Sequence, residues 1–377
     1  MDHNLTIVRR GFLARAVAAI AIAGLPGFSV LAAAKGQEDV QAVIGRLAAA
    51  NAFNGVVLLG LNGAISYARS FGLADIEARR PARIDDAYAI ASISKWLTTI
   101  AVLRLVERGK LDLDAPITQW LPGYRKDTGA RLTLRHLLWN SSGLIEQFSP
   151  QAKADPTLLT LDMPASEAVR RYASADLYFD PGTKFDYIFA NWILVYAILE
   201  AITGQSYARA MHALVLDPLG LKHTDVAATL AGSPALVPSY TTVAPVARRS
   251  YDRPPFLAAA GGYISTGRDL LKAAHGVFDN GFLSTASLRT LLSKRAEEDE
   301  YALGGRVKFL PLDGKVATIA WETGNTAGYR SVCAHRLDTR ESVVILNNTS
   351  LSQRVLDEFA TAIFSSLGSG LIEVARR

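Results

Sequence analysis

The sequence predicts an α/β fold in which an antiparallel sheet is flanked by helices and interrupted by a mainly helical insertion. Two observations support this arrangement. Strand-like apolar runs occur near both ends of the chain, and the stretch between them shows helical periodicity. Half of the 377 residues are apolar, which suffices for a large core. We expect the sheet part to comprise about residues 38–115 and 256–370, and the helical part about 116–255.

The N-terminal elements are predicted from apolar spacing and turn residues. In order, they are a helix over 40–47, strands over 55–60 and 64–68, and a helix from Ser92 to about Gly109. The dipeptide Asn62-Gly63 between the two strands is typical of a tight hairpin turn.

The later elements follow from the same signals. Helices are predicted over 134–138, 187–203, 207–216, 266–278, from 284 and over 353–367, and strands over 316–321, 329–335 and 341–346. Thr133 is a cap before the first of these helices, and Gly204 ends the second. Residues 231–260 are rich in proline and lack periodicity, so we expect a loop there.

The N-terminal segment, residues 1–34, is predicted to be a twin-arginine signal peptide. Arg9-Arg10 precedes an alanine-rich apolar run, and Ala32-Ala33-Ala34 offers a cleavage site of small residues. The alternative is an uncleaved membrane anchor, which the weak hydrophobicity and the interruption at Pro26 disfavour. We therefore expect a periplasmic or secreted protein over 35–377, with no stable membrane insertion after signal cleavage.

Composition argues against several classes of function. The net charge of +5 is mild, and no basic run with interleaved aromatic residues indicates nucleic-acid binding. The single cysteine, Cys333, excludes an intrachain disulfide and is expected to be a buried, inert thiol. The histidines do not show metal-ligand spacing, so no metal or other cofactor is expected. The sequence does not specify the oligomeric state.

The main candidate for chemistry is Ser92-Ile93-Ser94-Lys95, at the start of an apolar helix. Side chains three residues apart share a helix face, so Lys95 could exchange a proton with the hydroxyl of Ser92. The helix N-terminus also stabilises an anion formed there. On the motif alone, the simpler interpretation is a capped helix start with Lys95 on the surface. The apolar residues that follow indicate a buried helix. Because burying a lysine is costly, they favour a functional role for Lys95.

Two other segments could contribute to such a site. Tyr187 lies where a loop meets a predicted helix, although it could equally be a half-buried core tyrosine. Residues 323–329 are mostly small and connect two strands, which would let a ligand approach the backbone. The alternative is an ordinary hairpin connection.

These segments, in this order, resemble the serine hydrolases related to class C β-lactamases, a group that includes D-alanyl-D-alanine peptidases, D-amino-acid peptidases and β-lactamase-type esterases. The resemblance covers nearly the whole mature chain. Its further matches are Gly55-Val56-Val57-Leu58, Phe71-Gly72-Leu73-Ala74-Asp75, Glu107-Arg108-Gly109-Lys110-Leu111, His136-Leu137-Leu138-Trp139-Asn140-Ser141-Ser142-Gly143, Pro181-Gly182-Thr183-Lys184-Phe185-Asp186-Tyr187, Asp217-Pro218-Leu219-Gly220-Leu221 and Gly261-Gly262-Tyr263. It implies a β-lactamase/transpeptidase-like fold without a cofactor.

The resemblance also implies a mechanism. Ser92 would attack a carbonyl carbon, Lys95 and Tyr187 would move its proton, and water would release the acyl group. The backbone N–H groups of Ser92 and Asn325 would form the oxyanion hole, with Thr323 and Gly324 beside them. The sequence does not say whether Lys95 or Tyr187 is the general base.

The chain departs from the family pattern at substrate-facing positions. Phe189 stands where an asparagine is usual, and Asn191 is no positional substitute for it. Glu322 replaces a lysine or histidine, and Asn140 stands where relatives often have a second histidine. A glutamate at position 322 would repel a substrate carboxylate and, if close to Lys95, would keep that lysine protonated.

We therefore expect an exported serine hydrolase that acts through an acyl-enzyme on carboxylic esters or amides, most nearly an esterase. The alternatives are a D-aminopeptidase, in which Glu322 pairs with a substrate amine, a DD-peptidase or a β-lactamase. A non-enzyme alternative is a catalytically weak relative that binds acyl ligands. In each case the partner is a small molecule or short peptide.

Overall fold

The computed structural model describes residues 39–227, 236–296, 300–312 and 314–367. The predicted signal peptide, residues 1–34, lies outside these ranges. Within them, no helix combines the length and the apolar character needed to cross a membrane.

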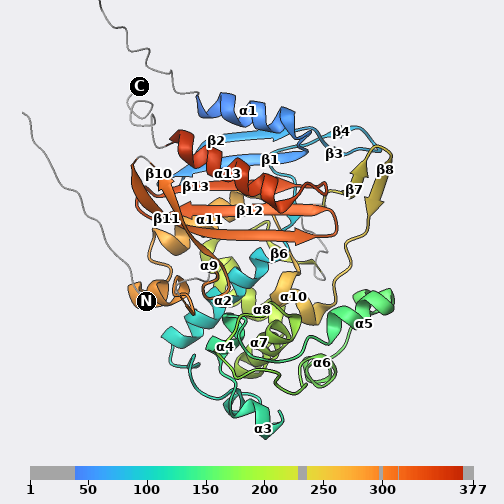
Figure 1. Ribbon diagram of the computed structural model, residues 1–377, viewed down its shortest axis with the longest axis vertical. Helices are drawn as coiled ribbons and strands as arrows, with labels where there is room; N and C mark the ends of the chain where they lie inside the picture. The colour runs from blue at the N-terminus through green and yellow to red at the C-terminus, as the bar shows by residue number, and fades with distance from the viewer. Residues whose placement is uncertain (1–38, 228–235, 297–299, 313, 368–377) are drawn as a thin grey trace, which may run out of the picture. The chain divides into compact units, whose positions relative to one another are not determined.

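A six-stranded antiparallel sheet contains strands from both ends of the chain (Figure 1). Its order is β10 (Val307–Leu312), β11 (Lys315–Thr326), β12 (Tyr329–Arg336), β13 (Glu341–Asn347), β1 (Gly55–Leu61) and β2 (Ala64–Phe71). Gly55 of β1 pairs with Asn347 of β13, so the first and last strands are direct neighbours. Asn62 and Gly63 have φ values of 50° and 81°, as a two-residue hairpin turn requires. The predicted sheet built from both ends is confirmed.

Helices cover both faces of this sheet. On one face lie α1 (Val40–Ala50) and α13 (Gln353–Leu367), and on the other lie α2 (Ile93–Glu107) and α11 (Gly267–Phe278). This double cover explains why Val56, Val57 and Leu58 are consecutive in sequence and all fully buried. Thr266 caps α11 by accepting a hydrogen bond from the backbone N–H of Asp269.

The middle of the chain is helical, as predicted. It contains η1 (Ile117–Gln119), α3 (Lys126–Gly129), α4 (Leu134–Leu138), α5 (Phe148–Ala154), η2 (Pro156–Thr160), α6 (Ala165–Tyr172), α7 (Phe189–Thr203), α8 (Tyr207–Met211), η3 (His212–Leu216) and α9 (Asp217–Leu219). Helix α7 is buried along most of its length and ends at Gly204, whose φ is 62°. Figure 1 shows α3 to α8 below the sheet, and α2 lies where the two parts meet.

The region 231–260, predicted as a loop, is more ordered than expected. It contains a hairpin of β7 (Ser239–Val243) and β8 (Val246–Arg249), then η5 (Pro255–Leu257) and most of α10 (Ala258–Gly261). Pro245 lies in the hairpin turn, where a proline is compatible with strands on either side. The prediction of a structureless segment was therefore wrong for these residues.

Other short elements were also not predicted. They are β3 (Leu73–Asp75), β4 (Arg80–Pro81), β5 (Tyr88–Ala89), β6 (Asp225–Val226), β9 (Tyr263–Ser265), and the edge strand β10. Strands of two or three residues have no detectable period, and Pro311 within the six residues of β10 weakens its strand signal. Ser284 does cap α12 (Thr285–Leu291), as predicted.

Candidate active site

Ser92 immediately precedes α2 and does not act as its cap. Its side chain makes no capping hydrogen bond, and Ala91 before it has a φ of 46°, an unusual value for a residue with a side chain. The Ser92 Oγ instead accepts hydrogen bonds from the Tyr187 hydroxyl at 2.7 Å and from Lys95 Nζ at 3.3 Å. The capped-helix interpretation of the motif is therefore wrong.

Lys95 is buried, with only 1% of its surface exposed. Its amine donates to the Ala260 carbonyl oxygen of α10 and lies 4.6 Å from the ring centre of Tyr187 and 5.4 Å from that of Trp192. Burial lowers the pKa of the amine well below its ordinary value, and the positive charges of Arg253 and Arg306 lower it further. Lys95 thus has the environment of a neutral amine.

Tyr187 lies in the extended segment before α7, two residues earlier than the helix itself. The predicted start of this helix was therefore too early. The side chain is 39% exposed, and its hydroxyl reaches Ser92. Desolvation raises the pKa of Tyr187 to about 12, although the hydrogen bond to Ser92 and the charge of Arg306 act in the opposite direction.

The end of β11 lies against the backbone that carries Ser92. A Cβ atom on Gly324 would come within 2.1 Å of the Ile90 carbonyl oxygen, so only glycine fits there. Ser331 on the neighbouring strand donates to the same oxygen at 3.2 Å. These contacts place the exposed Asn325 near the start of α2, while Thr323 accepts a hydrogen bond from Arg306 at 3.0 Å.

Glu322 is turned into the protein. It is 5% exposed. A Cβ atom added to Gly305 would come within 2.0 Å of a carboxyl oxygen of Glu322, so the carboxyl group packs directly against that glycine. Burial raises its pKa to about 8, against the lowering effect of Arg306. Across the described ranges, no hydrogen bond or ion pair joins Glu322 to Lys95. The expectation that Glu322 would hold Lys95 protonated is not supported by these contacts.

Phe189 is the first residue of α7, and its backbone N–H donates to the Glu146 carboxylate at 2.6 Å. Its ring centre lies 5.9 Å from Lys95 Nζ and 5.8 Å from the Arg253 guanidinium. The electron-rich face of an aromatic ring attracts a nearby guanidinium. Phe189 therefore supplies packing where the family pattern has an amide.

A family model described as Beta-lactamase matches residues 25–365, which is most of the chain. This chain belongs to the Beta-lactamase family.

Curated relatives of this Beta-lactamase-family protein include esterase EstB of Burkholderia gladioli, 40% identical over 178 residues. That match covers 44% of this chain and 45% of EstB, less than half of either. Penicillin-binding protein 4* of Bacillus subtilis is 25% identical, with 83% of this chain and 72% of that protein covered.

Solved structures show the same fold for this Beta-lactamase-family protein. The D-amino acid amidase of Ochrobactrum anthropi SV3, in complex with L-phenylalanine amide, aligns with a TM-score of 0.74 at 22% identity. The alignment covers 87% of this chain and 99% of the amidase. The β-lactamase/transpeptidase-like fold is thus confirmed, and at a coarse level the comparisons support a hydrolase of this fold.

A buried group of hydrogen-bonded side chains lies in the helical part and consists of Asn140, Asn191 and Trp192. Asn140 has a φ of 51°, and its Oδ1 accepts hydrogen bonds from Asn191 Nδ2 at 3.3 Å and Trp192 Nε1 at 3.1 Å. Asn191 therefore holds a buried loop in this Beta-lactamase-family protein. It does not replace the amide lost at Phe189.

Sequence reasoning missed Arg253 and Arg306 as neighbours of Lys95 and Tyr187. Their charges act on both groups, yet Arg253 lies 158 positions beyond Lys95 in the chain. Neither arginine belongs to a recognisable motif, so no signal in the sequence could have identified them. Cys333 is buried and free, as predicted.

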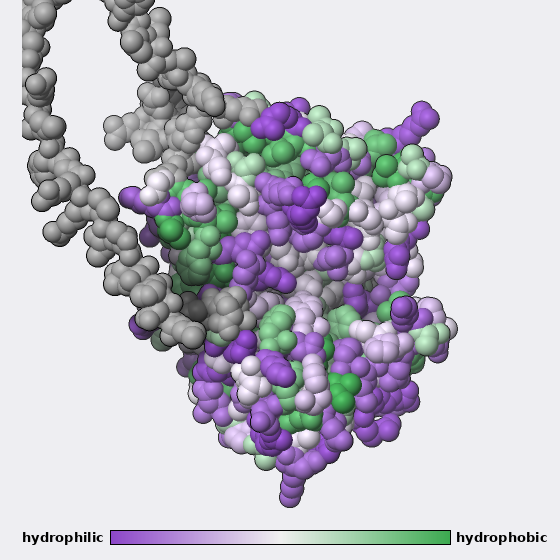
Figure 2. Space-filling model, viewed as in Figure 1, coloured by the Kyte–Doolittle hydropathy of each residue, from purple (hydrophilic) through white to green (hydrophobic). Residues whose placement is uncertain are grey.

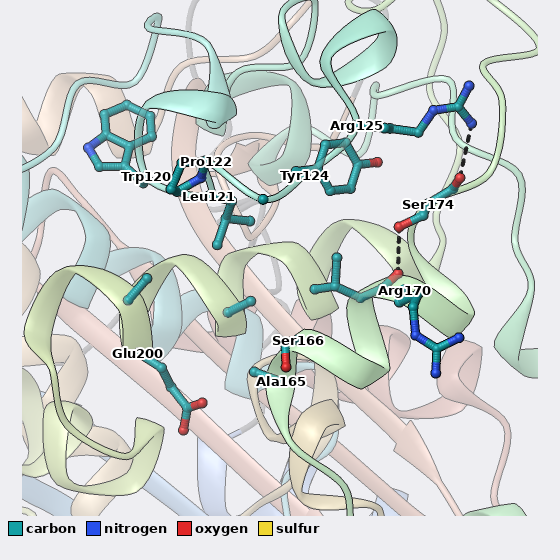
Figure 3. A pocket seen from close by; sticks show the side chains of 14 residues that line it. Trp120, Leu121, Pro122, Tyr124, Arg125, Ala165, Ser166, Arg170, Ser174 and Glu200 are labelled. Carbon is teal, nitrogen blue, oxygen red and sulfur yellow. Dashed lines mark hydrogen bonds between the residues drawn. The ribbon is translucent and has the colours of Figure 1, made fainter.

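A large cavity in the described part of this Beta-lactamase-family protein is separate from these residues. A pocket of about 760 Å³ lies between residues 120–125 and helices α6 and α7, with an apolar lining. Figure 3 shows Leu121 and Tyr124 facing Ser166 and Glu200 across it. Ser92, Lys95 and Tyr187 do not line this pocket. In the part of the chain that the structure describes, no group of three or more potential ligands could hold a metal ion.

Proposed function

We propose that this protein is a Ser-Lys-Tyr serine hydrolase that cleaves carboxylic esters or amides through an acyl-enzyme at Ser92, with esterase-like activity foremost. The observation that carries the proposal is the pair of contacts at Ser92 Oγ, with Tyr187 at 2.7 Å and Lys95 at 3.3 Å. A hydroxyl held between a phenol and a desolvated amine is the arrangement that nucleophilic catalysis needs. The similarity to EstB supports an ester substrate.

The charge states of the two neighbours suggest their roles. Since the pKa of Tyr187 is about 12, the tyrosine is protonated at neutral pH and is a proton donor. Lys95, whose pKa is lowered by burial, is the base that takes the Ser92 proton as Oγ attacks the carbonyl carbon. Tyr187 then protonates the leaving group as the acyl bond breaks, and Lys95 returns a proton to Tyr187.

The negative charge of the tetrahedral intermediate would be stabilised by the backbone N–H groups of Ser92 and Asn325. The first N–H groups of a helix have no partner within the helix, and they point toward an anion at its start. Hydrolysis of the acyl-enzyme then repeats these steps with water as the nucleophile.

Amide hydrolysis is the second candidate activity. The alignment with the D-amino acid amidase spans 99% of that enzyme, which favours it. The further idea that Glu322 pairs with a substrate amine loses support, because this side chain is buried against Gly305. DD-peptidase and β-lactamase activities, and ligand binding without turnover, remain outcomes of the test.

We also propose that residues 1–34 direct export through the twin-arginine route, which would place the enzyme in the periplasm or outside the cell. The support is the sequence Arg9-Arg10 with the small residues at 32–34. N-terminal sequencing of the exported protein, in cells with and without an Arg9-Arg10 to Lys-Lys replacement, tests this proposal. Export of the replaced protein at the wild-type rate would contradict it.

The test of catalysis combines turnover and labelling. We expect wild-type protein to hydrolyse p-nitrophenyl butyrate and to form a fluorophosphonate adduct at Ser92, and Ser92→Ala to lose both. Ser166→Ala, an exposed serine in the helical part, is the control and should behave as wild type. Hydrolysis of D- and L-aminoacyl anilides tests for amidase or aminopeptidase activity, and hydrolysis of nitrocefin tests for β-lactamase activity. A folded wild-type protein without turnover or adduct would favour a binding module.

A further inference from the structure

Arg253 lies close enough to Lys95 and Tyr187 for its charge to act on both groups. Its guanidinium is 5.8 Å from the ring centre of Phe189 and 6.0 Å from that of Tyr251. One of its terminal nitrogens donates to Thr326 Oγ1 at 2.7 Å. The arginine is therefore held between the start of α7 and the end of β11.

These anchors place Arg253 close to the reacting groups. The ring of Phe189 also lies 5.9 Å from Lys95 Nζ, which is itself 3.3 Å from Ser92 Oγ. Thr326 directly follows Asn325, the proposed oxyanion-hole residue. A ligand that reaches Ser92 from this side therefore meets the guanidinium.

The charge of Arg253 is not neutralised within the described ranges, where no carboxylate forms an ion pair with it and its Nε has no hydrogen-bond partner. A guanidinium carries five N–H donors in a planar fork and is always charged. By contrast, Arg248, five residues earlier, is paired with the Glu77 carboxylate at 3.2 Å. Arg253 thus has donors left for a ligand.

Carboxylates near the site do not pair with this charge in the described residues: Glu146 instead accepts a hydrogen bond from the backbone N–H of Phe189 at 2.6 Å. Glu322 is buried against Gly305, and its carboxyl oxygens are directed away from solvent. Arg306 adds a second positive charge, held by Thr323 at 3.0 Å and by the ring of Tyr301 at 5.4 Å. The surroundings of Ser92 are therefore positive, contrary to what Glu322 suggested from the sequence.

We infer that Arg253 binds a carboxylate of the substrate, so that this protein prefers esters or amides with a negative charge over neutral ones. Carboxylates match the guanidinium fork through two parallel hydrogen bonds. The inference rests on the proposed function and names the substrate class of the same site. In the alternative, Arg253 only anchors Thr326 and thereby the end of β11.

The test compares a neutral ester, p-nitrophenyl butyrate, with two charged esters. Mono-p-nitrophenyl glutarate carries a carboxylate on the acyl part, and 3-carboxy-4-nitrophenyl butyrate carries one on the leaving group. We expect wild type to have a higher kcat/KM for at least one charged ester. Arg253→Gln should lower the ratio of kcat/KM for that charged ester to kcat/KM for the neutral ester about tenfold or more, because a change in the basicity of Lys95 would act on all the esters alike. Arg253→Lys should restore part of the preference.

Two comparisons separate a binding role from a structural one. Arg248→Gln, which removes a nearby arginine that is already paired with Glu77, should leave the preference unchanged. The advantage of the charged ester should also decrease as salt rises, since screening weakens an accessible charge pair. Equal losses of kcat/KM on all three esters in Arg253→Gln would overturn the inference.

Failure of the proposed function can be recognised independently. Loss of neutral-ester hydrolysis in Ser92→Ala tests the nucleophile without involving Arg253. If the wild type hydrolyses none of the esters, glutarate binding to Ser92→Ala protein is measured by calorimetry, with and without Arg253→Gln. Weaker glutarate binding in the double variant supports the carboxylate site, and equal or absent binding in both proteins overturns it.

Discussion

At the scale of single residues, the candidate site contains two groups whose pKa values differ from those of the free amino acids. Lys95 is buried beneath Tyr187 and has a lowered pKa, whereas the pKa of Tyr187 is raised to about 12. The same desolvation acts in opposite directions because one group loses its charge when deprotonated and the other gains one. Both shifts favour an uncharged group, a neutral amine at Lys95 and a protonated phenol at Tyr187.

These states predict a pH profile. We expect kcat/KM for a neutral ester to rise with pH as Lys95 loses its proton. Ionisation of the Tyr187 hydroxyl should not decrease kcat/KM below about pH 11. Tyr187→Phe should lower kcat by about 10²–10⁴, the usual contribution of a positioned proton donor. Steady-state kinetics from pH 5 to 10 check this. An alkaline decline near pH 9 that is absent in Tyr187→Phe would contradict the assignment.

Glu322 predicts a second pH effect, on stability. Its pKa is about 8 in the folded protein and near 4.5 when unfolded. Between these values the unfolded chain releases the proton that the folded chain keeps, so the free energy of unfolding falls as pH rises from about 4.5 to about 8. This decrease in the free energy of unfolding should be on the order of a few kcal/mol in the wild type, and Glu322→Gln should abolish it.

Urea unfolding at pH 5 and pH 8 measures this difference. Glu358→Gln, an exposed glutamate on α13, is the matched control and should leave the pH dependence unchanged. The raised pKa would be refuted if wild type and Glu322→Gln lost the same stability between the two pH values.

At the scale of elements, stability depends on how β12, β13, α11 and α2 pack together. A buried hydrogen-bonded chain supports α11 on the sheet: His335 Nε2 meets Asp279 Oδ1 at 3.1 Å, and His335 Nδ1 meets Ser342 Oγ at 2.8 Å. His335 also stacks on Phe278, which stacks on Trp96 of α2. These hydrogen bonds and ring contacts around His335 therefore connect β12 and β13 to α2, the helix that carries Lys95.

This arrangement predicts acid sensitivity. Burial lowers the pKa of His335 below its ordinary value of 6.5, although Asp279 opposes the shift. The unfolded chain takes up a proton near pH 6.5 and the folded chain resists it, so this group costs stability as pH falls through that value. His335→Gln should cost about 1–3 kcal/mol at pH 8, where a buried hydrogen bond is lost.

The stability difference between wild type and His335→Gln should therefore shrink from pH 8 to pH 5, as measured by urea unfolding. Ester hydrolysis at pH 8 should change little, because His335 does not contact Ser92, Lys95 or Tyr187. A difference that stays constant with pH would exclude the protonation argument.

At the scale of the whole molecule, the described residues share a continuous core across both parts of the fold. The largest cluster of buried apolar side chains includes Val56 of the sheet, Trp96 of α2 and Trp192 of α7. A second cluster, around Trp321, fills the space beneath α1 and α13. Figure 2 shows hydrophilic side chains spread over this face, with smaller apolar groups between them.

We therefore predict that the sheet part and the helical part unfold together. A shared core couples the loss of one part to the loss of the other, as in a two-state transition. Denaturation curves from tryptophan fluorescence and far-ultraviolet circular dichroism should coincide. Trp321→Phe leaves Trp96 and Trp192 as buried reporters of the larger cluster and should give the same midpoint by both signals. Two separated transitions would show that the insertion folds independently.

The sequence by itself determined the long elements and the three groups at the centre of the site. Period, caps and turn residues are local signals, so the β1–β2 hairpin, the cap at Thr133 and the end of α7 at Gly204 could be predicted. The pairing of Ser92 with Lys95 followed from a motif at the start of a helix, and the family resemblance added Tyr187 to that pair. The short strands and the hairpin of β7 and β8 could not be found, because they are defined by their partners.

Only the tertiary structure decided the electrostatics of the site. The sequence suggested an acidic site through Glu322, but packing buries that side chain against Gly305 and brings Arg253 and Arg306 toward Lys95. The physical reason is that a charge acts through distance and burial, and neither is encoded in neighbouring residues of the chain.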